Sequence, residues 1–282
     1  MLYFLYKAGR ALAMALPLRI GYKIAEIIAA VYYLLARADR KNLEENLKIV
    51  LGCDNKQTAS LYTRGIFKNF AKYLVDFFRF SRIGSDYIIK YVTISGKENL
   101  DKAMAGGKGA IILSSHLGNW ELGGGITASF GYPFYAIALD HKNKKVNDFF
   151  IKQRAAFNVR VIPIGAQLRN CFKVLRQNNL LAILGDRDFS NHGITANFFG
   201  RPTLLPKGPA IFNLRTGAPI IPAFAIRLPD DRFNLIYERP IQIKPTGDEE
   251  KDIANVMHNY INVIERYIKS YPDQWYAFRK VW

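Results

Sequence analysis

The sequence predicts an α/β fold with a mostly parallel central sheet flanked by helices. From residue 91 onward, short apolar runs alternate with longer segments whose apolar residues recur at helical spacing. Alternation of this kind is typical of a parallel sheet that is covered by helices on both faces. The chain of 282 residues, half of them hydrophobic, is also long enough to bury one substantial core.

Each expected strand is a short apolar run between polar, glycine or proline residues. The expected strands are 91–95, 110–114, 135–139, 159–163, 180–184, 194–198, 220–228 and 233–238. The expected helices are 58–80, 97–105, 120–129, 144–156, 166–178, 208–216 and 250–270. The first of these helices carries an aromatic stripe, which is more often part of a core than the wall of a ligand pocket.

The first 40 residues differ from the rest of the chain in composition. Residues 1–36 are mostly apolar, and their longest charge-free run, 27–36, is about half as long as a bilayer-crossing helix must be. The charges that interrupt them are Lys7, Arg10, Arg19, Lys23 and Glu26. This pattern predicts two short amphipathic helices, separated near Pro17, that lie in a membrane interface. The alternative is a helical cover over the core. We therefore expect a membrane-associating region at 1–40 and one main domain at 41–282.

The net charge of +17 indicates an anionic partner, which is a nucleic acid, a membrane surface or a phosphorylated substrate. A nucleic acid is disfavoured because no helix-turn-helix, zinc-finger or RNP-type motif is present and the basic residues are spread along the chain. A merely solvated basic surface is the other alternative. Cys53 and Cys171 have no CxxC or metal-ligand spacing, so we expect neither a disulfide framework nor a bound metal.

The main candidate site follows the apolar run 110–113. His116 comes directly after Ser114 and Ser115, which close this strand, and Glu121 falls in the first turn of the next helix. His116 is therefore expected at the carboxyl end of a strand, where α/β folds usually bind ligands. A carboxylate at Glu121 is then able to orient the imidazole, so the two residues predict a general base that acts on a hydroxyl group. The alternative is a core histidine with a hydrogen-bonded partner.

The residues around this pair fit a substrate site. Asn119 is expected to cap the helix and to contact substrate, and the glycines at 123–125 leave room beside the pair. Ser114 and Ser115 are poor candidates for a hydrolase nucleophile, because the GxSxG elbow is missing.

A second cluster of charged residues follows the apolar run 180–184. Asp186 and Arg187 come at the end of that strand, while Arg201 and Lys207 lie in later turns that are rich in glycine and proline. Because neighbouring parallel strands end at the same edge, these charges are expected to form an anion-binding site that faces His116. The alternative is a set of surface turns.

Taken together, these motifs resemble the bacterial lipid A acyltransferase (late acyltransferase) family of the lysophospholipid acyltransferase superfamily. The resemblance begins with the H-x4-E motif, His116 to Glu121, and continues in order to the end of the chain. The later segments are Asp186-Arg187-Asp188, Phe198-Phe199-Gly200, Lys207-Gly208-Pro209-Ala210, Leu214-Arg-Thr-Gly-Ala-Pro219 and Tyr271-Pro-Asp-Gln-Trp275.

The resemblance implies a glycerolipid acyltransferase-like fold and transfer of an acyl chain from a thioester to a hydroxyl of an anionic membrane glycolipid, similar to a lipid A precursor. The donor is acyl carrier protein or acyl-CoA, no cofactor is needed, and the expected location is the cytoplasmic face of the bacterial inner membrane. In this scheme His116 is the general base and Glu121 is its partner. The oxyanion that forms during transfer needs hydrogen-bond donors, which we expect among the backbone N–H groups of 117–119.

One departure from the family concerns the headgroup. Many relatives carry an arginine in a basic-Pro-Asn stretch after the third core strand, where this sequence has Leu139-Asp-His-Lys-Asn143. Lys142 or Arg154 is expected to bind a phosphate in its place. Two alternatives to a glycolipid acyltransferase stay open, namely a lysophospholipid or glycerol-phosphate acyltransferase and a non-catalytic membrane-binding protein.

Overall fold

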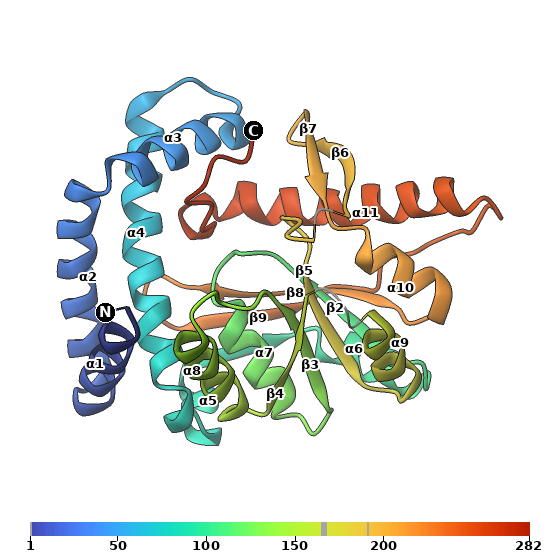
Figure 1. The fold of residues 1–282 in the computed structure, drawn as a ribbon, viewed down its shortest axis with the longest axis horizontal. Helices are drawn as coiled ribbons and strands as arrows, with labels where there is room; N and C mark the ends of the chain where they lie inside the picture. The colour runs from blue at the N-terminus through green and yellow to red at the C-terminus, as the bar shows by residue number, and fades with distance from the viewer. Residues whose placement is uncertain (1, 165–167, 191) are drawn as a thin grey trace.

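The computed structural model describes residues 2–164, 168–190 and 192–282 and contains a seven-stranded sheet in the order β1-β9-β8-β2-β5-β3-β4 (Figure 1). All neighbouring strands run parallel except β8 and β9, which are antiparallel. The strands are β1 (Val92–Ser95), β2 (Ala110–Ser114), β3 (Phe134–Ala138), β4 (Val159–Pro163), β5 (Leu180–Leu184), β8 (Ile220–Arg227) and β9 (Phe233–Tyr237). The predicted α/β class and mostly parallel sheet are confirmed, and each of these strands agrees with its expected range to within one residue at either end.

Helices cover both faces of the sheet, as expected. They are α1 (Leu2–Ala15), α2 (Leu18–Leu35), α3 (Arg37–Leu51), α4 (Lys56–Phe78), α5 (Ser85–Tyr91), α6 (Lys97–Ala105), α7 (Trp120–Ala128), α8 (Lys144–Ala155), α9 (Leu168–Arg176), α10 (Gly208–Thr216) and α11 (Glu249–Ser270). Alternate residues of β2 enter opposite cores: Ile111 packs with α9, α10 and α11, and Ile112 packs with α7 and α8. The sequence did not predict α3 and α5, and the first two residues of the expected helix 166–178 lie outside the described ranges.

The expected strand 194–198 is present, but it is not part of the central sheet. β6 (Ile194–Phe198) pairs with β7 (Arg201–Leu205) as a separate antiparallel hairpin. The two residues between them, Phe199 and Gly200, have φ values of 53° and 76°. Positive φ at both positions of a two-residue loop is the geometry of the tightest hairpin turns, so the chain reverses here and does not cross over to the sheet.

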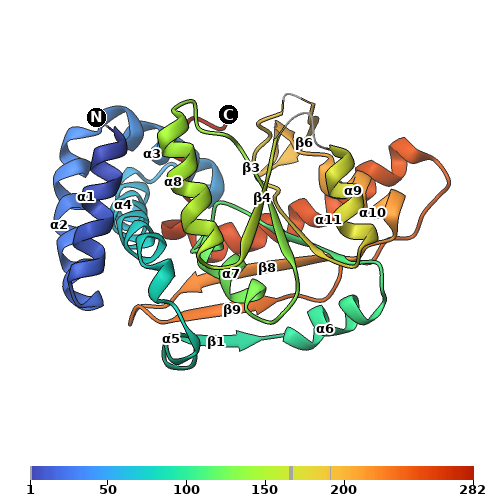
Figure 2. The same ribbon diagram turned by 60° about the horizontal axis from the view of Figure 1, so that its bottom comes forward.

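The predicted amphipathic helices α1 and α2 are present and are separated at Pro17. Figures 1 and 2 show them side by side at one end of the molecule, where both pack against α4. Their buried residues are mostly small, such as Ala13, Ala25 and Ala29, and their large apolar side chains face outward. Among the described residues, no helix combines the length and the apolar character that a membrane crossing requires.

The aromatic stripe of α4 serves two purposes. Phe67, Phe77 and Phe78 are buried in the core, in line with the structural interpretation of such a stripe. Phe70 and Tyr73 of the same helix line a large cavity. The helix therefore joins the amino-terminal helices to the candidate site.

Candidate active site

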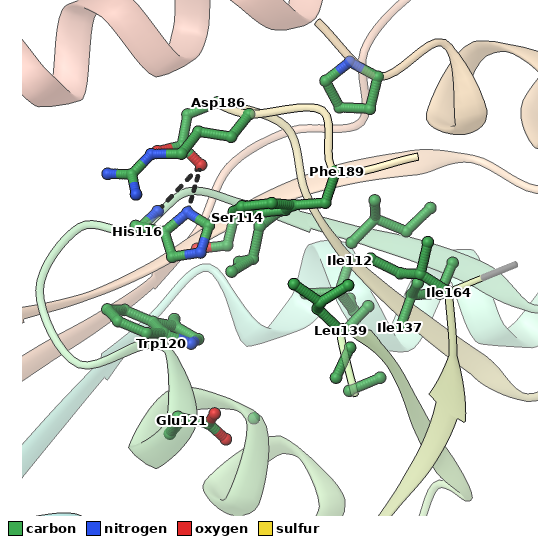
Figure 3. Close-up of a pocket in the computed structure, with 18 of the residues that line it drawn as sticks. Ile112, Ser114, His116, Trp120, Glu121, Ile137, Leu139, Ile164, Asp186 and Phe189 are labelled. Carbon is green, nitrogen blue, oxygen red and sulfur yellow. Dashed lines mark hydrogen bonds and ion pairs between the residues drawn. The ribbon is translucent and has the colours of Figure 1, made fainter. Parts of the chain in front are cut away.

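A cavity of about 1230 Å³ lies at the carboxyl ends of the strands, where the sequence placed the site. Among the residues that line it are His116, just beyond β2, and Asp186, just beyond β5. Because β2 and β5 are hydrogen-bonded neighbours in a parallel sheet, the loops that follow them meet (Figure 3). The structure therefore brings His116 together with Asp186, Arg187 and Lys207 of the second cluster, but not with Arg201.

The carboxylate that contacts the imidazole of His116 is Asp186 (Figure 3). His116 Nδ1 lies 2.9 Å from Asp186 Oδ1, and the backbone N–H of His116 donates to the same oxygen at 3.1 Å. The indole N–H of Trp275 donates to the other oxygen, Oδ2, at 3.0 Å. With Nδ1 as the donor to Asp186, the lone pair of the ring is on Nε2, where it is able to accept a proton.

Asp186 is fully buried, yet its surroundings favour the ionised form. Burial opposes ionisation, but the charge and hydrogen bond of His116, the charge of Arg187 and the hydrogen bond from Trp275 together hold the pKa of Asp186 well below its usual range. An ionised Asp186 fixes the tautomer of the imidazole and stabilises the imidazolium that forms when Nε2 accepts a proton.

The carboxyl-terminal segment holds the His116 loop in place. The N–H of Tyr276 donates to the carbonyl of His116 at 2.9 Å, and the N–H of Gly118 donates to the carbonyl of Gln274 at 3.0 Å. Gly118 has a φ of 62°, and a Cβ at this position would lie 2.2 Å from the carbonyl oxygen of Ala225. Only glycine fits there, so the backbone itself requires a glycine two residues after His116.

The predicted contact between Glu121 and His116 is corrected by the geometry. Both carboxylate oxygens of Glu121 accept from Arg154 Nε at 3.0 Å, and Arg154 Nη2 also donates to Oε1. Arg154 comes from α8, which packs beside the first turn of α7 that carries Glu121. His116 and Glu121 do line the same cavity, but each uses a different partner. Arg154 was expected to bind a phosphate, and its guanidinium is already paired with Glu121.

Asn119 caps α7, as predicted, and also joins a buried polar network. Its side-chain oxygen accepts from the N–H of Leu122 at 3.1 Å, and its amide donates to Asp76 at 2.8 Å. Asp76 in turn pairs with Arg227 and accepts from the hydroxyl of Tyr22 on α2. Asn119 itself is 1% exposed and does not line the cavity, so its predicted contact with substrate is corrected: its side chain holds the backbone that follows His116.

The other predicted binding residues separate into two groups. Arg187 and Lys207 line the cavity. Lys142 is exposed on the loop before α8 and Arg201 is exposed on the hairpin, and neither lines the cavity. Arg187 donates to the carbonyl of Tyr276 at 2.7 Å through Nη2, while its Nε is buried without a hydrogen-bond partner among the described residues.

The part of the cavity between α7 and the sheet is narrow, apolar and lined by small side chains. Gly123 and Gly124 line it from α7, and the facing strands contribute Ala136, Ala182, Ala223 and Ala225. A glycine inside a helix makes the free energy of helix formation less favourable than an alanine does, by about 1 kcal/mol. This part of the cavity, the apolar channel, runs from Ser114 at the carboxyl end of β2 to Phe134 and Val159 at the amino ends of β3 and β4.

Comparison with known proteins identifies the family of this chain. The sequence profile described as "Bacterial lipid A biosynthesis acyltransferase" matches residues 1–282. The chain belongs to the bacterial lipid A biosynthesis acyltransferase family. It is also 25% identical over 287 residues to the phosphatidylinositol mannoside acyltransferase of Mycobacterium tuberculosis, with 98% of this chain and 87% of the relative aligned. The enzyme of the same name from Mycolicibacterium smegmatis is 24% identical over 283 residues, with 98% and 90% aligned.

The predicted resemblance is therefore confirmed over the whole chain, and the family together with these relatives supports an acyltransferase that acts on a glycolipid. Sequence reasoning did not find two features of this family member. It placed Asp186 in an anion site and did not pair it with His116, and it noted Trp275 only as part of a family motif. Within the described ranges, no cluster of three or more potential ligands for a metal ion is present.

Proposed function

We propose that this chain transfers a fatty acyl group from an acyl thioester, carried by acyl carrier protein or coenzyme A, to a hydroxyl of an anionic membrane glycolipid. The observation that carries this proposal is the His116–Asp186 pair, because it sits in a cavity with an apolar channel on one side and basic side chains at its rim. The acyl chain of a thioester requires an apolar environment on one side of the base, and a phosphorylated lipid requires a basic environment on the other side.

The base acts on the acceptor. Nε2 of His116 takes the proton of the acceptor hydroxyl as its oxygen attacks the thioester carbon, and Asp186 stabilises the resulting imidazolium. The thiolate that leaves then takes this proton from Nε2, so the imidazole returns to its starting form. A general base of this type contributes about 10²- to 10⁴-fold to a reaction rate.

Glu121 supports this centre through Arg154. Because its two oxygens are bonded to the guanidinium, we assign Glu121 the role of fixing Arg154 against the cavity wall. Arg154 has further N–H groups with which it is able to meet a carbonyl or phosphate oxygen of substrate. This retains the predicted importance of Glu121 but changes its task.

The charge of the rim suits a phosphorylated group. Arg187, Lys207, Arg279 and Lys280 all line the cavity. Burial lowers the pKa of Arg187; the charge of Asp186 opposes this shift, and the nearby charge of Arg279 adds to it. An anion bound between these cations relieves their mutual repulsion and accepts hydrogen bonds from them.

The amino-terminal helices suit a lipid surface. Most of the large hydrophobic side chains that are exposed in the described residues lie on α1 and α2, and they include Phe4, Ile27 and Leu35 at 64–74% exposure. Exposed cations, among them Lys7 and Lys23, lie on the same helices. This combination favours the interface of an anionic membrane. We therefore propose that residues 1–40 associate with the cytoplasmic face of the bacterial inner membrane and that 41–282 form the acyltransferase domain.

Two acceptor classes should be tested first. The family suggests a lipid A precursor, and the names of the relatives add phosphatidylinositol mannosides. A lysophospholipid such as lysophosphatidic acid represents the alternative acyltransferase reaction.

The experiment incubates the purified full chain with acyl-CoA or acyl carrier protein thioester and each acceptor in vesicles. Mass spectrometry should detect an acceptor heavier by one acyl group, together with release of the free thiol. His116→Ala should lose about 10²- to 10⁴-fold in rate because no group accepts the proton. Its circular dichroism and vesicle binding should be unchanged. Equal rates for His116→Ala and the wild type would rule out the general base, and vesicle binding that survives deletion of residues 1–36 would remove the membrane role of α1 and α2.

A further inference from the structure

Two adjacent serines at the end of β2 and the start of the His116 loop have buried hydroxyl groups whose hydrogen-bonding is incomplete. Ser114 is 8% exposed and Ser115 is 0% exposed, and neither Oγ atom has a hydrogen-bond partner among the described residues. A buried hydroxyl without a partner is unfavourable by about 1–3 kcal/mol, so each one calls for an explanation. The two hydroxyl groups need different explanations, because Ser114 and Ser115 differ in their position relative to the cavity.

Only one of these two hydroxyls is placed to meet a ligand. Ser114 lines the cavity, whereas Ser115 does not. Ser114 shares its side of β2 with Ile112, which faces α7 and the apolar channel. Figure 3 shows the Ser114 side chain beside His116 at the same end of the strand. The hydroxyl therefore lies where the channel begins and the base is located.

The strand keeps Ser114 in a fixed position. Ser114 is paired with Leu184 in the β2–β5 ladder, and its carbonyl accepts from the N–H of Gly185 at 2.8 Å. A donor on such a rigid element needs little reorganisation when charge develops near it.

The backbone groups expected to bind the oxyanion are largely occupied. The N–H of Gly118 donates to Gln274, and the N–H of Asn119 donates to the carbonyl of Ala225 at 2.8 Å. The N–H of His116 is bonded to Asp186. The loop thus uses for its own structure two of the three amides that the sequence assigned to catalysis, those of Gly118 and Asn119, which leaves a place for a side-chain donor to the developing charge.

We propose that the hydroxyl of Ser114 donates a hydrogen bond to the carbonyl oxygen of the thioester and stabilises the oxyanion, which makes Ser114 a catalytic residue. This inference rests on the proposed acyl transfer. As the acceptor oxygen bonds to the carbonyl carbon, its proton passes to His116 Nε2 and the carbonyl π electrons move to the oxygen. Ser114 donates to this oxygen. The C–O double bond then re-forms, the C–S bond breaks, and the thiolate takes the proton from His116.

The first test compares Ser114→Ala with Ser115→Ala, which removes an equally buried hydroxyl from the next residue outside the cavity. With an acyl thioester and vesicles of total lipid from the source organism, Ser114→Ala should lose about 10²-fold in kcat with little change in KM, as expected for one oxyanion donor. Ser115→Ala should stay within about twofold of wild type, and Ser114→Thr, which keeps a hydroxyl, should recover most of the loss. Thermal unfolding should show no destabilisation, because each alanine removes an unpartnered polar group.

The second test measures binding without turnover. A long-chain alkylphosphonate, whose tetrahedral oxygens resemble the oxyanion, should bind Ser114→Ala about tenfold or more weakly than wild type, since such analogues bind through interactions made in the transition state. A long-chain alcohol of equal length, which lacks those oxygens, should bind both proteins equally.

Equal kcat values for Ser114→Ala and Ser115→Ala, alongside an active wild type, would overturn the role of Ser114 and leave the proposed function intact. An acyl adduct on Ser114 in the intact protein would also overturn it, because the residue would then be a nucleophile. A wild-type protein that transfers no acyl group from any thioester, to any acceptor, would overturn both proposals.

Discussion

The His116–Asp186 pair and the Glu121–Arg154 pair line one cavity, and both contain a buried carboxylate. Asp186 faces an imidazole, which is able to accept and release a proton, and it is held on its other side by Trp275. Glu121 faces a guanidinium, which stays charged at all ordinary pH values. The first pair is therefore suited to moving a proton and the second to holding a fixed positive charge. A carboxylate that is close to a histidine in the sequence is therefore not necessarily its hydrogen-bond partner in the structure.

The largest expected effect comes from neutralising the carboxylate on the histidine. Asp186→Asn should lower kcat by about 10³- to 10⁴-fold, because an amide at this position favours the wrong imidazole tautomer and does not stabilise the imidazolium. Steady-state acyl transfer measures the loss. Glu121→Gln should lose less activity under the same conditions. A larger loss for Glu121→Gln than for Asp186→Asn would reverse the two assignments.

The two carboxylates should also differ in what they do for stability. Glu121→Gln leaves the charge of Arg154 unpaired at a site where its side chain is only 14% exposed, so the free energy of unfolding should fall by about 3 kcal/mol. The double variant Glu121→Gln/Arg154→Met should recover most of this loss because no unpaired charge remains. Urea unfolding followed by circular dichroism provides the measurement. No recovery in the double variant would show that the destabilisation has another cause.

The channel that begins between the two pairs should determine acyl chain length. A Cβ at Gly124 would lie 3.3 Å from the ring of Phe134, so the larger side chain of Gly124→Val should close the far end of the channel. Each excluded methylene is worth about 0.8 kcal/mol, or about fourfold in selectivity. A mixture of acyl thioesters of graded length, analysed by mass spectrometry, should show a shift to shorter products. Gly84→Ala, at a glycine with open space around it and outside the cavity, is the control and should leave the distribution unchanged.

Substitutions of the cations at the rim of the cavity should affect the reaction less than substitutions in its interior. Lys207→Ala removes a cation that lines the cavity and should raise the KM for an anionic acceptor by about tenfold, which corresponds to one charged hydrogen bond. Lys142→Ala removes an exposed cation that does not line it and should change KM little. Equal effects of the two substitutions would indicate general attraction by the net charge and no specific site.

The smallest expected effect is the pH dependence of stability due to Asp186. Its pKa is lowered in the folded state, so its ionised form stabilises the fold above the unfolded-state pKa of about 4, and this contribution is lost as the pH falls towards the folded-state value. The difference in unfolding free energy between wild type and Asp186→Asn should therefore be constant at neutral pH and shrink below about pH 4. A difference that grows on acidification would contradict the ionised state of Asp186.

The centre of the sheet was predictable because β2 and β5 consist almost entirely of apolar residues and are followed by glycine or polar residues. β2, Ala-Ile-Ile-Leu-Ser, is buried along its whole length, and its limits follow directly from that composition. β7 was not predictable in this way, because Arg201, Pro202 and Leu204 are exposed on a two-stranded hairpin. Such a strand is specified by the turn at Phe199-Gly200 and not by burial.

The site was predictable to the level of the cavity but not to that of its hydrogen bonds. Strand ends placed His116 and Asp186 together, since both follow apolar strands. The pairing itself depends on β2 and β5 being neighbours in the sheet, which no local pattern reveals. The contribution of Trp275 depends on a contact across 89 residues, and only the family motif at 271–275 pointed to it.

The bonds that Trp275 and Tyr276 make to Asp186 and His116 also have a consequence for biosynthesis. A nascent chain that has already formed the sheet and α7 still lacks the indole that orients Asp186 and the amide that fixes the His116 loop. We therefore expect the site around His116 to be complete only after Trp275 and Tyr276 have been synthesised and have packed against Asp186 and the His116 loop.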